Sequence, residues 1–280
     1  MTITELRRTL HSMPELSGAE ARTAALLKGF LETTGPSRLI PDIAGHGIAA
    51  LYGGGRPGPV IMVRCELDAL PRPDGPGAYH GCGHDGHMAI AAGLAERLGS
   101  SPPERGSVLV LFQPAEETGA GAALVLADRR FAAVMPDMAV ALHNIPGFPM
   151  GRILLKAGVF AAASTGITVR LRGTRSHAGE PHKGNNPAMA MAQIIQTFSA
   201  VPQFSTGLNQ FGKVTVVHAG LGARAFGTSP DEAVVMAVIR ALDAGETDRL
   251  YRRCETLATG IAAAFDLEVT VEGAEEFPPT

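Results

Sequence analysis

Hydrophobic positions in the first half of the chain alternate between helical spacing and short continuous apolar runs. Over residues 17–34 the apolar side chains recur at helical spacing, which predicts an amphipathic helix capped by Ser17. Apolar runs bounded by glycine and proline predict buried strands at 47–52, 60–65, 108–112 and 138–142. Helices are predicted between them at 85–98 and near 120–126. Because strands alternate with helices, we expect a three-layer α/β/α domain with a largely parallel sheet covered on both faces.

The pattern changes after about residue 160. Residues 166–172 alternate between apolar and polar side chains, as a half-exposed strand does, and 187–201 predict a helix that begins near Pro187. Further strands are predicted at 213–217, 233–238 and 267–271, with a helix at 247–264. The order strand-helix-strand-strand-helix-strand is typical of a ferredoxin-like α+β unit. We therefore expect a second, smaller domain with a four-stranded antiparallel sheet that is exposed on one face.

Composition and charge narrow the classes of partner. The 280 residues carry 24 Lys and Arg against 27 Asp and Glu, with no run of like charge, so we expect no nucleic acid partner. No stretch reaches the roughly 18 apolar residues of a bilayer span, and the first residues lack a signal-peptide pattern. We therefore predict a cytoplasmic protein with no membrane partner. Cys65, Cys82 and Cys254 lack disulfide spacing and are expected to be free thiols.

The densest group of polar side chains lies in the segment His-Gly-Cys-Gly-His-Asp-Gly-His at 80–87. Cysteine and histidine bind borderline transition metals, and the intervening glycines let the backbone turn both ligands toward one point. The segment leads into a predicted helix, whose positive N-terminal end favours the thiolate form of Cys82. The alternative is a glycine-rich turn with surface histidines, which so dense a run of imidazole and thiol groups disfavours.

Two further clusters follow predicted strands. Glu116 and Glu117 come after the strand that ends at Phe112. Neighbouring side chains on a regular strand face opposite ways, so both serve one site only where the strand is ending, as Pro114 indicates. One carboxylate could then bind a metal while the other moves a proton; the alternative is a solvated acidic loop. His143 follows the next apolar strand, where a histidine is more often a hydrogen-bonded rim residue than a ligand. All three clusters fall at carboxyl ends of strands, where open sheets place their ligands.

Six short motifs occur in the order and approximate spacing of the M20 metallopeptidase family. They are Asp-Ala-Leu-Pro at 68–71, Cys-Gly-His-Asp-Gly-His at 82–87, Phe-Gln-Pro-Ala-Glu-Glu at 112–117, Leu-His-Asn at 142–144, Ser-His-Ala at 176–178 and Phe-Gly-Thr-Ser-Pro-Asp at 226–231. The chain resembles the amidohydrolase branch that includes aminoacylases, hippurate hydrolases and plant auxin-conjugate hydrolases. The resemblance implies a metal-binding catalytic domain at 1–158, an inserted ferredoxin-like lid or dimerisation domain at 159–272, and the start of a return to the catalytic domain at 273–280.

The resemblance also implies roles for individual residues. Those that match ligands of a two-metal site are Cys82, His84, Glu117 and His143. Glu116 matches the catalytic carboxylate, and Asp68 lies where an acid that orients a ligand is expected. His177 matches a lid histidine that, in family dimers, reaches into the site of the neighbouring subunit. Glu66 stands where many relatives carry aspartate, which we interpret as a mild change beside the site.

These roles imply a metal-dependent amidohydrolase that cleaves the amide bond of N-acyl amino acids or similar small amides. Two cations bridged by a thiolate and a water would lower the pKa of that water and polarise the amide carbonyl. Glu116 would relay the proton to the leaving amine, and His177 would donate a hydrogen bond to the oxyanion. The donor set suits Zn, Co or Ni, and its carboxylates also admit Mn. The expected partners are a small N-acyl amino acid or amide and a second copy of the chain.

The end of the chain suggests an alternative function. Family members continue past residues 277–280 into a segment that re-enters the catalytic domain and supplies a further histidine ligand. Without such a segment the first sheet is expected to be incomplete and to have an unpaired edge. The alternative is therefore a catalytically inactive or split-subunit homologue that keeps the fold and binds a partner, such as a separate carboxyl-terminal polypeptide.

Overall fold

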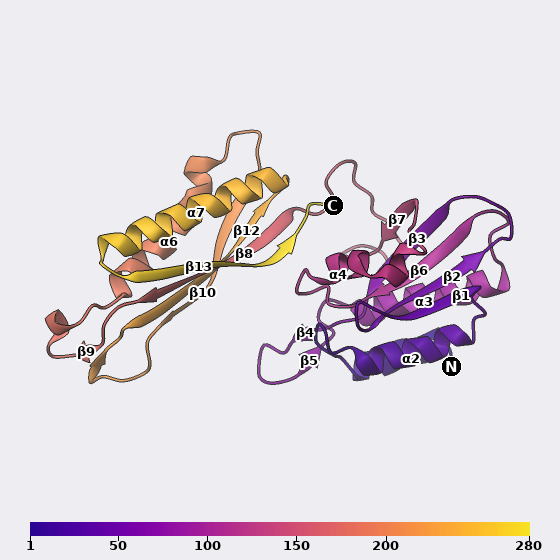
Figure 1. The fold of residues 1–280 in the computed structure, drawn as a ribbon, viewed down its shortest axis with the longest axis horizontal. Coiled ribbons are helices and arrows are strands. Elements are labelled where there is room, and N and C mark those ends of the chain that lie inside the picture. The colour runs from indigo at the N-terminus through magenta and orange to yellow at the C-terminus, as the bar shows by residue number, and fades with distance from the viewer. The chain divides into compact units, whose positions relative to one another are not determined.

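The computed structural model describes residues 1–280, which divide into two units, Met1–Arg152 and Ile153–Thr280 (Figure 1). The first unit is built on a five-stranded sheet with the strand order β1-β2-β6-β3-β7. Its strands are β1 (Arg38–Ile43), β2 (Gly47–Gly53), β3 (Val60–Glu66), β6 (Ser107–Gln113) and β7 (Met138–Ala141). A separate small ribbon pairs β4 (Leu70–Pro71) with β5 (Ala78–Tyr79).

The sheet of the first unit is mixed, and the prediction of a largely parallel sheet is wrong for one side of it. β3 pairs in parallel with β6 and β7, whereas β2 pairs antiparallel with both β1 and β6. The strands β1 and β2 form a hairpin whose turn uses the positive φ angles of Ala44 (51°) and Gly45 (97°). A turn this short joins antiparallel neighbours, because a parallel pair needs a long crossover.

Helices cover both faces of this sheet. On one face lie α1 (Ile3–Ser12), α2 (Ala21–Glu32) and α3 (His84–Ser100), and on the other lie the short helices α4 (Gly121–Ala127) and α5 (Arg129–Ala132). The central strand β6 shows why two cores form, since its successive side chains point to opposite faces. Val110 and Phe112 pack with the first group of helices, while Leu109 and Leu111 pack with α4 and α5.

The start of α2 differs from the prediction. The helix begins at Ala21, with Glu20 rather than Ser17 in the capping position. The Ser17 hydroxyl is engaged elsewhere, because it donates a 2.6 Å hydrogen bond to Oδ2 of Asp68. Ser17 therefore contacts the segment that follows β3, and the residues before Ala21 do not extend the helix.

The second unit contains a four-stranded antiparallel sheet with the order β10-β12-β8-β13. In chain order its main elements are β8 (Ala163–Arg172), α6 (Ala188–Ser205), β10 (Gly212–Leu221), β12 (Glu232–Ala241), α7 (Ala244–Ala264) and β13 (Glu268–Phe277). This is the predicted order of strands and helices. Two short strands, β9 (Ser176–His177) and β11 (Thr228–Ser229), pair with each other, and a single 3-10 turn covers Pro181–Lys183.

Both helices of the second unit pack on one face of its sheet. Ile167 and Val169 of β8 contact the same core as Phe198 of α6 and Leu250 of α7. On the opposite face alternate side chains such as Met236 are exposed. In the whole chain, no helix is both long and apolar enough to cross a bilayer.

Candidate metal centre

The loop before α3 and the first turn of that helix carry the densest predicted motif. Gly83 precedes the helix with a left-handed backbone, φ +87°. A Cβ atom at Gly83 would lie 2.8 Å from Oδ1 of Asn144, so both the backbone angle and the space require glycine. The second residue of the helix, Asp85, is buried and accepts from Nε of Arg7 at 2.9 Å and from Nδ1 of His11 at 2.8 Å. Helix α1 thus holds the start of α3 in place.

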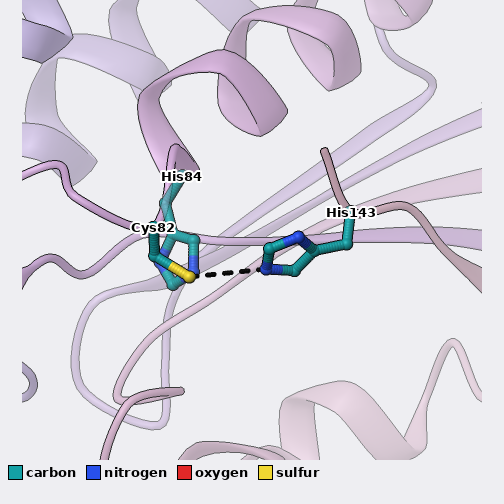
Figure 2. Close-up of side chains that lie close together, drawn as sticks. All are labelled: Cys82, His84 and His143. Carbon is teal, nitrogen blue, oxygen red and sulfur yellow. Dashed lines mark hydrogen bonds between the residues drawn. The ribbon is translucent and has the colours of Figure 1, made fainter. Parts of the chain in front are cut away.

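Cys82, His84 and His143 converge from two separate segments. Their ligand atoms lie within 4.8 Å of one another, and Figure 2 shows His143 approaching Cys82 from the opposite side to the start of α3. Sγ of Cys82 lies 3.4 Å from Nε2 of His143. Nδ1–H of His143 donates to the carbonyl oxygen of Asn144 at 2.9 Å, which leaves Nε2 free to accept or to bind a cation.

His84 occupies the centre of the cluster. It is buried, and its Nδ1–H donates to the main-chain carbonyl of Asp68 at 2.9 Å. The other nitrogen, Nε2, lies 3.9 Å from Oε2 of Glu116 and 3.7 Å from Oε1 of Glu117. A hydrogen bond that fixes one imidazole nitrogen as donor leaves the second as a lone-pair ligand, which is the usual arrangement in metal sites.

The two glutamates reach this site because β6 ends before them. Ala115 has a left-handed backbone (φ +52°), so Glu116 and Glu117 both approach His84 instead of pointing to opposite faces. Asp68 links their loop to the segment after β3, because its Oδ2 accepts from the main-chain N–H of Glu117 at 2.9 Å. Asp68, His84 and Glu116 form a second group with ligand atoms within 4.8 Å of one another.

The electrostatics of the site favour a cation. Burial opposes the charged form of His84, but Asp68, Cys82 and Glu66 outweigh it and raise the pKa of this histidine to about 11. Burial also raises the pKa of Glu116 and of Glu117, with His84 opposing the change in both. A site that draws a proton onto a buried imidazole so strongly concentrates negative charge, and the same charge attracts a metal ion.

Buried polar atoms without hydrogen-bond partners indicate whether these residues suit a metal ion. Oδ1 of Asp68, Nε2 of His84 and Oε1 of Glu117 are all buried and have no hydrogen-bond partner. Buried polar atoms are rarely left unpaired, and Oε1 of Glu117 lies 3.7 Å from Nε2 of His84. A cation bound between them would take the place of the proton that His84 holds on Nε2 without metal. Thiolate, imidazole and carboxylate together suit a borderline divalent cation. The residues present therefore fit a metal centre.

Behind His143 lies a chain of buried polar contacts that the sequence did not assign. Nδ1–H of His87 donates to Oε2 of Glu66 at 2.9 Å, and Nε2 of His87 accepts from the main-chain N–H of Asn144 at 3.0 Å. Glu66 is also paired with Arg64. His87 lies three residues after His84 on α3, and this helical spacing is the signal that could have placed both on one side.

The other singled-out residues make contacts of their own within their units. His177 belongs to β9 of the second unit, where its Nδ1 accepts from the main-chain N–H of Gly179 at 3.0 Å. His80 stacks on His11, with ring centroids 6.2 Å apart. Cys65 is buried in a core of the first unit and Cys254 in the core of the second, and burial raises the pKa of both thiols, that of Cys254 to about 12.

The sequence is similar to a known protein family and to individual proteins of other bacteria. The profile of peptidase family M20/M25/M40 matches residues 62–276. The N-acetyldiaminopimelate deacetylase of Enterococcus faecalis is 32% identical over 277 residues, which cover 95% of this chain and 72% of that protein. The N-acetyl-L-cysteine deacetylase of Bacillus subtilis is also 32% identical, over 98% of this chain and 67% of its own length.

Solved structures share the fold. A dinuclear metal-binding peptidase of the M20 family from Bacillus subtilis aligns with 99% of this chain and 74% of its own, with a TM-score of 0.73 and 26% identity. A structure described as an aminohydrolase from methicillin-resistant Staphylococcus aureus aligns with 99% of this chain and 76% of its own, with a TM-score of 0.82 and 24% identity. The backbone of this chain thus follows that of a protein known to bind two metals.

Proposed function

This chain belongs to the peptidase family M20/M25/M40, as its motifs predicted, and we infer that it is a metal-dependent amidohydrolase of N-acyl amino acids or similar small amides. The observation that carries this inference is that buried donor atoms without hydrogen-bond partners surround the His84 ring. Oε1 of Glu117 lies 3.7 Å from Nε2 and Oδ1 of Asp68 lies 3.5 Å from Nδ1, with Cys82 and His143 beside them. Two relatives whose names specify removal of an acetyl group favour hydrolysis over a catalytically silent homologue.

We propose that Cys82, His84, Glu117 and His143 hold two divalent cations of the Zn, Mn, Co or Ni type. When bound, such cations polarise an amide carbonyl and make a water more acidic. Support for the ligand set comes from the tautomers of His84 and His143, because each donates through Nδ1 and turns Nε2 toward the cluster. Asp68 would orient His84 through its carbonyl and the loop of Glu117 through its carboxylate.

Glu116 is the proposed general base and acid. It would take a proton from the attacking water as the carbon–oxygen bond forms, and return it to the amine nitrogen as the carbon–nitrogen bond breaks. The products are then the free carboxylic acid and the free amine, with every proton accounted for. Its position within 3.9 Å of Nε2 of His84 supports this role, because the carboxylate lies beside the cluster without being fixed by a hydrogen bond.

His177 is the proposed donor to the oxyanion, supplied by a second copy of the chain. Because its Nδ1 accepts from Gly179, a neutral ring carries its proton on Nε2 and can donate it outward. We also propose that a separate carboxyl-terminal polypeptide covers β7, an edge strand whose four residues are all exposed, including Met138 and Val140. Light scattering would report both associations, because the first gives a dimer and the second a larger complex.

The proposed activity is tested with a panel of N-acetyl and N-benzoyl amino acids. The protein is stripped of metal, reloaded separately with Zn, Mn, Co or Ni, and assayed for release of the free amine. We expect turnover with at least one metal, and a kcat at least about 100-fold lower in the Glu116→Gln variant. If well-folded protein turns over no substrate with any of the four metals, the enzymatic function is wrong.

A further inference from the structure

Glu20 is a buried carboxylate outside the metal centre. It lies at the start of α2, and its side chain is wholly buried. Oε1 accepts two main-chain hydrogen bonds, from Gly18 at 2.9 Å and from Ala115 at 2.8 Å, whereas Oε2 is buried without a partner. Burying a carboxylate with one oxygen unpaired is unfavourable. An apolar side chain would avoid this cost, but it could not accept the two main-chain hydrogen bonds.

One of these contacts holds a strained residue. Ala115 has a φ of +52°, a conformation that residues with a Cβ atom rarely adopt and that persists only where the surroundings hold it. Its carbonyl oxygen is also held, accepting from the main-chain N–H of Gly121 at 2.9 Å and from the Thr118 hydroxyl at 3.3 Å. Both the N–H and the carbonyl group of Ala115 are therefore hydrogen-bonded. The carbonyl bonds come from nearby residues, whereas the N–H bond goes to Glu20, which is distant in the sequence.

The turn at Ala115 decides where the next two side chains go. In an extended strand Glu116 and Glu117 would face opposite sides of the sheet. With the left-handed residue before them, both carboxylates lie within 4 Å of Nε2 of His84. We propose that Glu20 is a positioning residue, whose carboxylate holds the Ala115 turn and so presents Glu116 and Glu117 to the metal centre. This proposal rests on the metal-binding and proton-transfer roles proposed above for the two glutamates.

Three substitutions separate this role from simple packing. Glu20→Gln keeps an oxygen acceptor for the Ala115 N–H. Glu20→Met has a similar volume but no acceptor, so it removes the unpaired Oε2 together with the hydrogen bonds from Gly18 and Ala115. Glu20→Met combined with Ala115→Gly places at 115 a residue that adopts a positive φ without restraint. The control is Glu15→Ala, because Glu15 accepts from Thr23 at the same end of α2 but makes no bond to Ala115.

Each variant is titrated with Co²⁺, and the visible spectrum reports the ligands around the ion. We expect Glu20→Met to bind Co²⁺ at least about tenfold more weakly with an altered spectrum, in the range found when residues behind metal ligands are removed. Glu20→Gln and Glu15→Ala should resemble the wild type, and Ala115→Gly should restore most of the affinity lost in Glu20→Met. A structural role alone would lower the unfolding temperature in step with the affinity, whereas the positioning role predicts weaker Co²⁺ binding without a matching loss of stability.

Wild-type Co²⁺ affinity and spectrum in folded Glu20→Met would overturn the proposal, as would failure of Ala115→Gly to restore binding. Should Glu20→Met not fold, Ala115→Val with Glu20 intact gives the same test, because a β-branched residue resists a positive φ. Weaker Co²⁺ binding by this variant supports the proposal, and unchanged binding contradicts it. These readouts do not depend on turnover. A wild type that binds Co²⁺ but hydrolyses nothing would therefore count against the proposed function and leave the role of Glu20 to be decided by the spectra.

Discussion

At the scale of single residues, the site combines groups whose chemistry is readable from the sequence with groups that are not. Cys82 and His84 were identified by their type and spacing, and His143 by the resemblance of its motif to the M20 family. The structure brings the ligand atoms of all three together. Glu20 could not be assigned this way, because its importance depends on a contact with a residue 95 positions away. A lone carboxylate carries no local signal of such a contact.

Cys82→Ser is expected to lower metal content, because an alcohol is a far weaker ligand than a thiolate and Sγ lies within 4.8 Å of the ligand nitrogens of His84 and His143. If the thiolate bridges two ions, both should be lost together. Elemental analysis after dialysis measures this, with Cys65→Ala as the control cysteine in the core. Retention of the wild-type metal content would show that Cys82 is not a ligand.

The adjacent glutamates should behave differently when each is changed to glutamine. Glu116→Gln should keep the metal but lower kcat by at least about 100-fold, because an amide cannot relay a proton. Glu117→Gln should lose metal, since its Oε1 is a buried, unpartnered donor atom. Metal content and kcat are measured on the same samples. Equal metal loss in the two variants would mean that the assignment within the pair is wrong.

At the scale of elements, the strongly apolar strands and the two helices of the second unit were predictable, and the elements with weak patterns were not. β1 was missed because Pro41 and charged residues interrupt its apolar pattern at the sheet edge. α1 was missed because only Leu6 and Leu10 of its ten residues are buried. The parallel or antiparallel sense of the strands depends on which strands become neighbours in space, and alternation along the chain does not fix this for β2.

The start of α3 depends on Gly83. Gly83→Ala should lower the free energy of unfolding by about 1–2 kcal/mol for the left-handed backbone alone. The added methyl group would also displace the Asn144 side chain, from which a Cβ lies only 2.8 Å away. Urea unfolding measures the first effect and metal titration the second. Gly86→Ala is the control, because a Cβ at that position of the same helix meets nothing within 4 Å.

The connection between the β1–β2 turn and α5 should make stability depend on pH. Hydrogen bonds from Arg130 and from the Ala44 main chain hold the pKa of Asp128 well below its ordinary value of 3.8. A depressed pKa in the folded state adds stability above the unfolded-state pKa, and this stability is lost as the pH falls through the folded-state value. Asp128→Asn should therefore lower the Tm at pH 7, with the difference from the wild type shrinking below about pH 4.

Asp74→Asn is the matched control for this measurement, since Asp74 is an exposed loop residue whose contact with Arg72 is local. Its Tm should differ little from that of the wild type at any pH. A difference between Asp128→Asn and the wild type that stays constant from pH 7 to pH 3 would show that the carboxylate charge is not the cause.

At the scale of the whole molecule, the chain presents two units, and the proposed site needs a residue from each. Glu116 lies in the first unit and His177 in the second. Mixing Glu116→Gln chains with His177→Ala chains, each inactive, should restore activity if one subunit supplies His177 to the other. Random exchange in a two-fold dimer would rebuild one site in half of the dimers, which gives about a quarter of the wild-type activity. Subunit exchange without recovered activity would exclude a shared site.

The different surroundings of the three cysteines have a practical consequence. Cys65 and Cys254 are sealed inside separate cores, so a thiol reagent added to the native protein should modify Cys82 alone. A bound cation would hold that sulfur and protect it. The rate at which Cys82 is alkylated therefore measures the metal occupancy of the centre, and the measurement needs no substrate. By the same reasoning, protein stored without metal should lose its capacity to be reloaded as Cys82 oxidises, and a reductant should preserve that capacity.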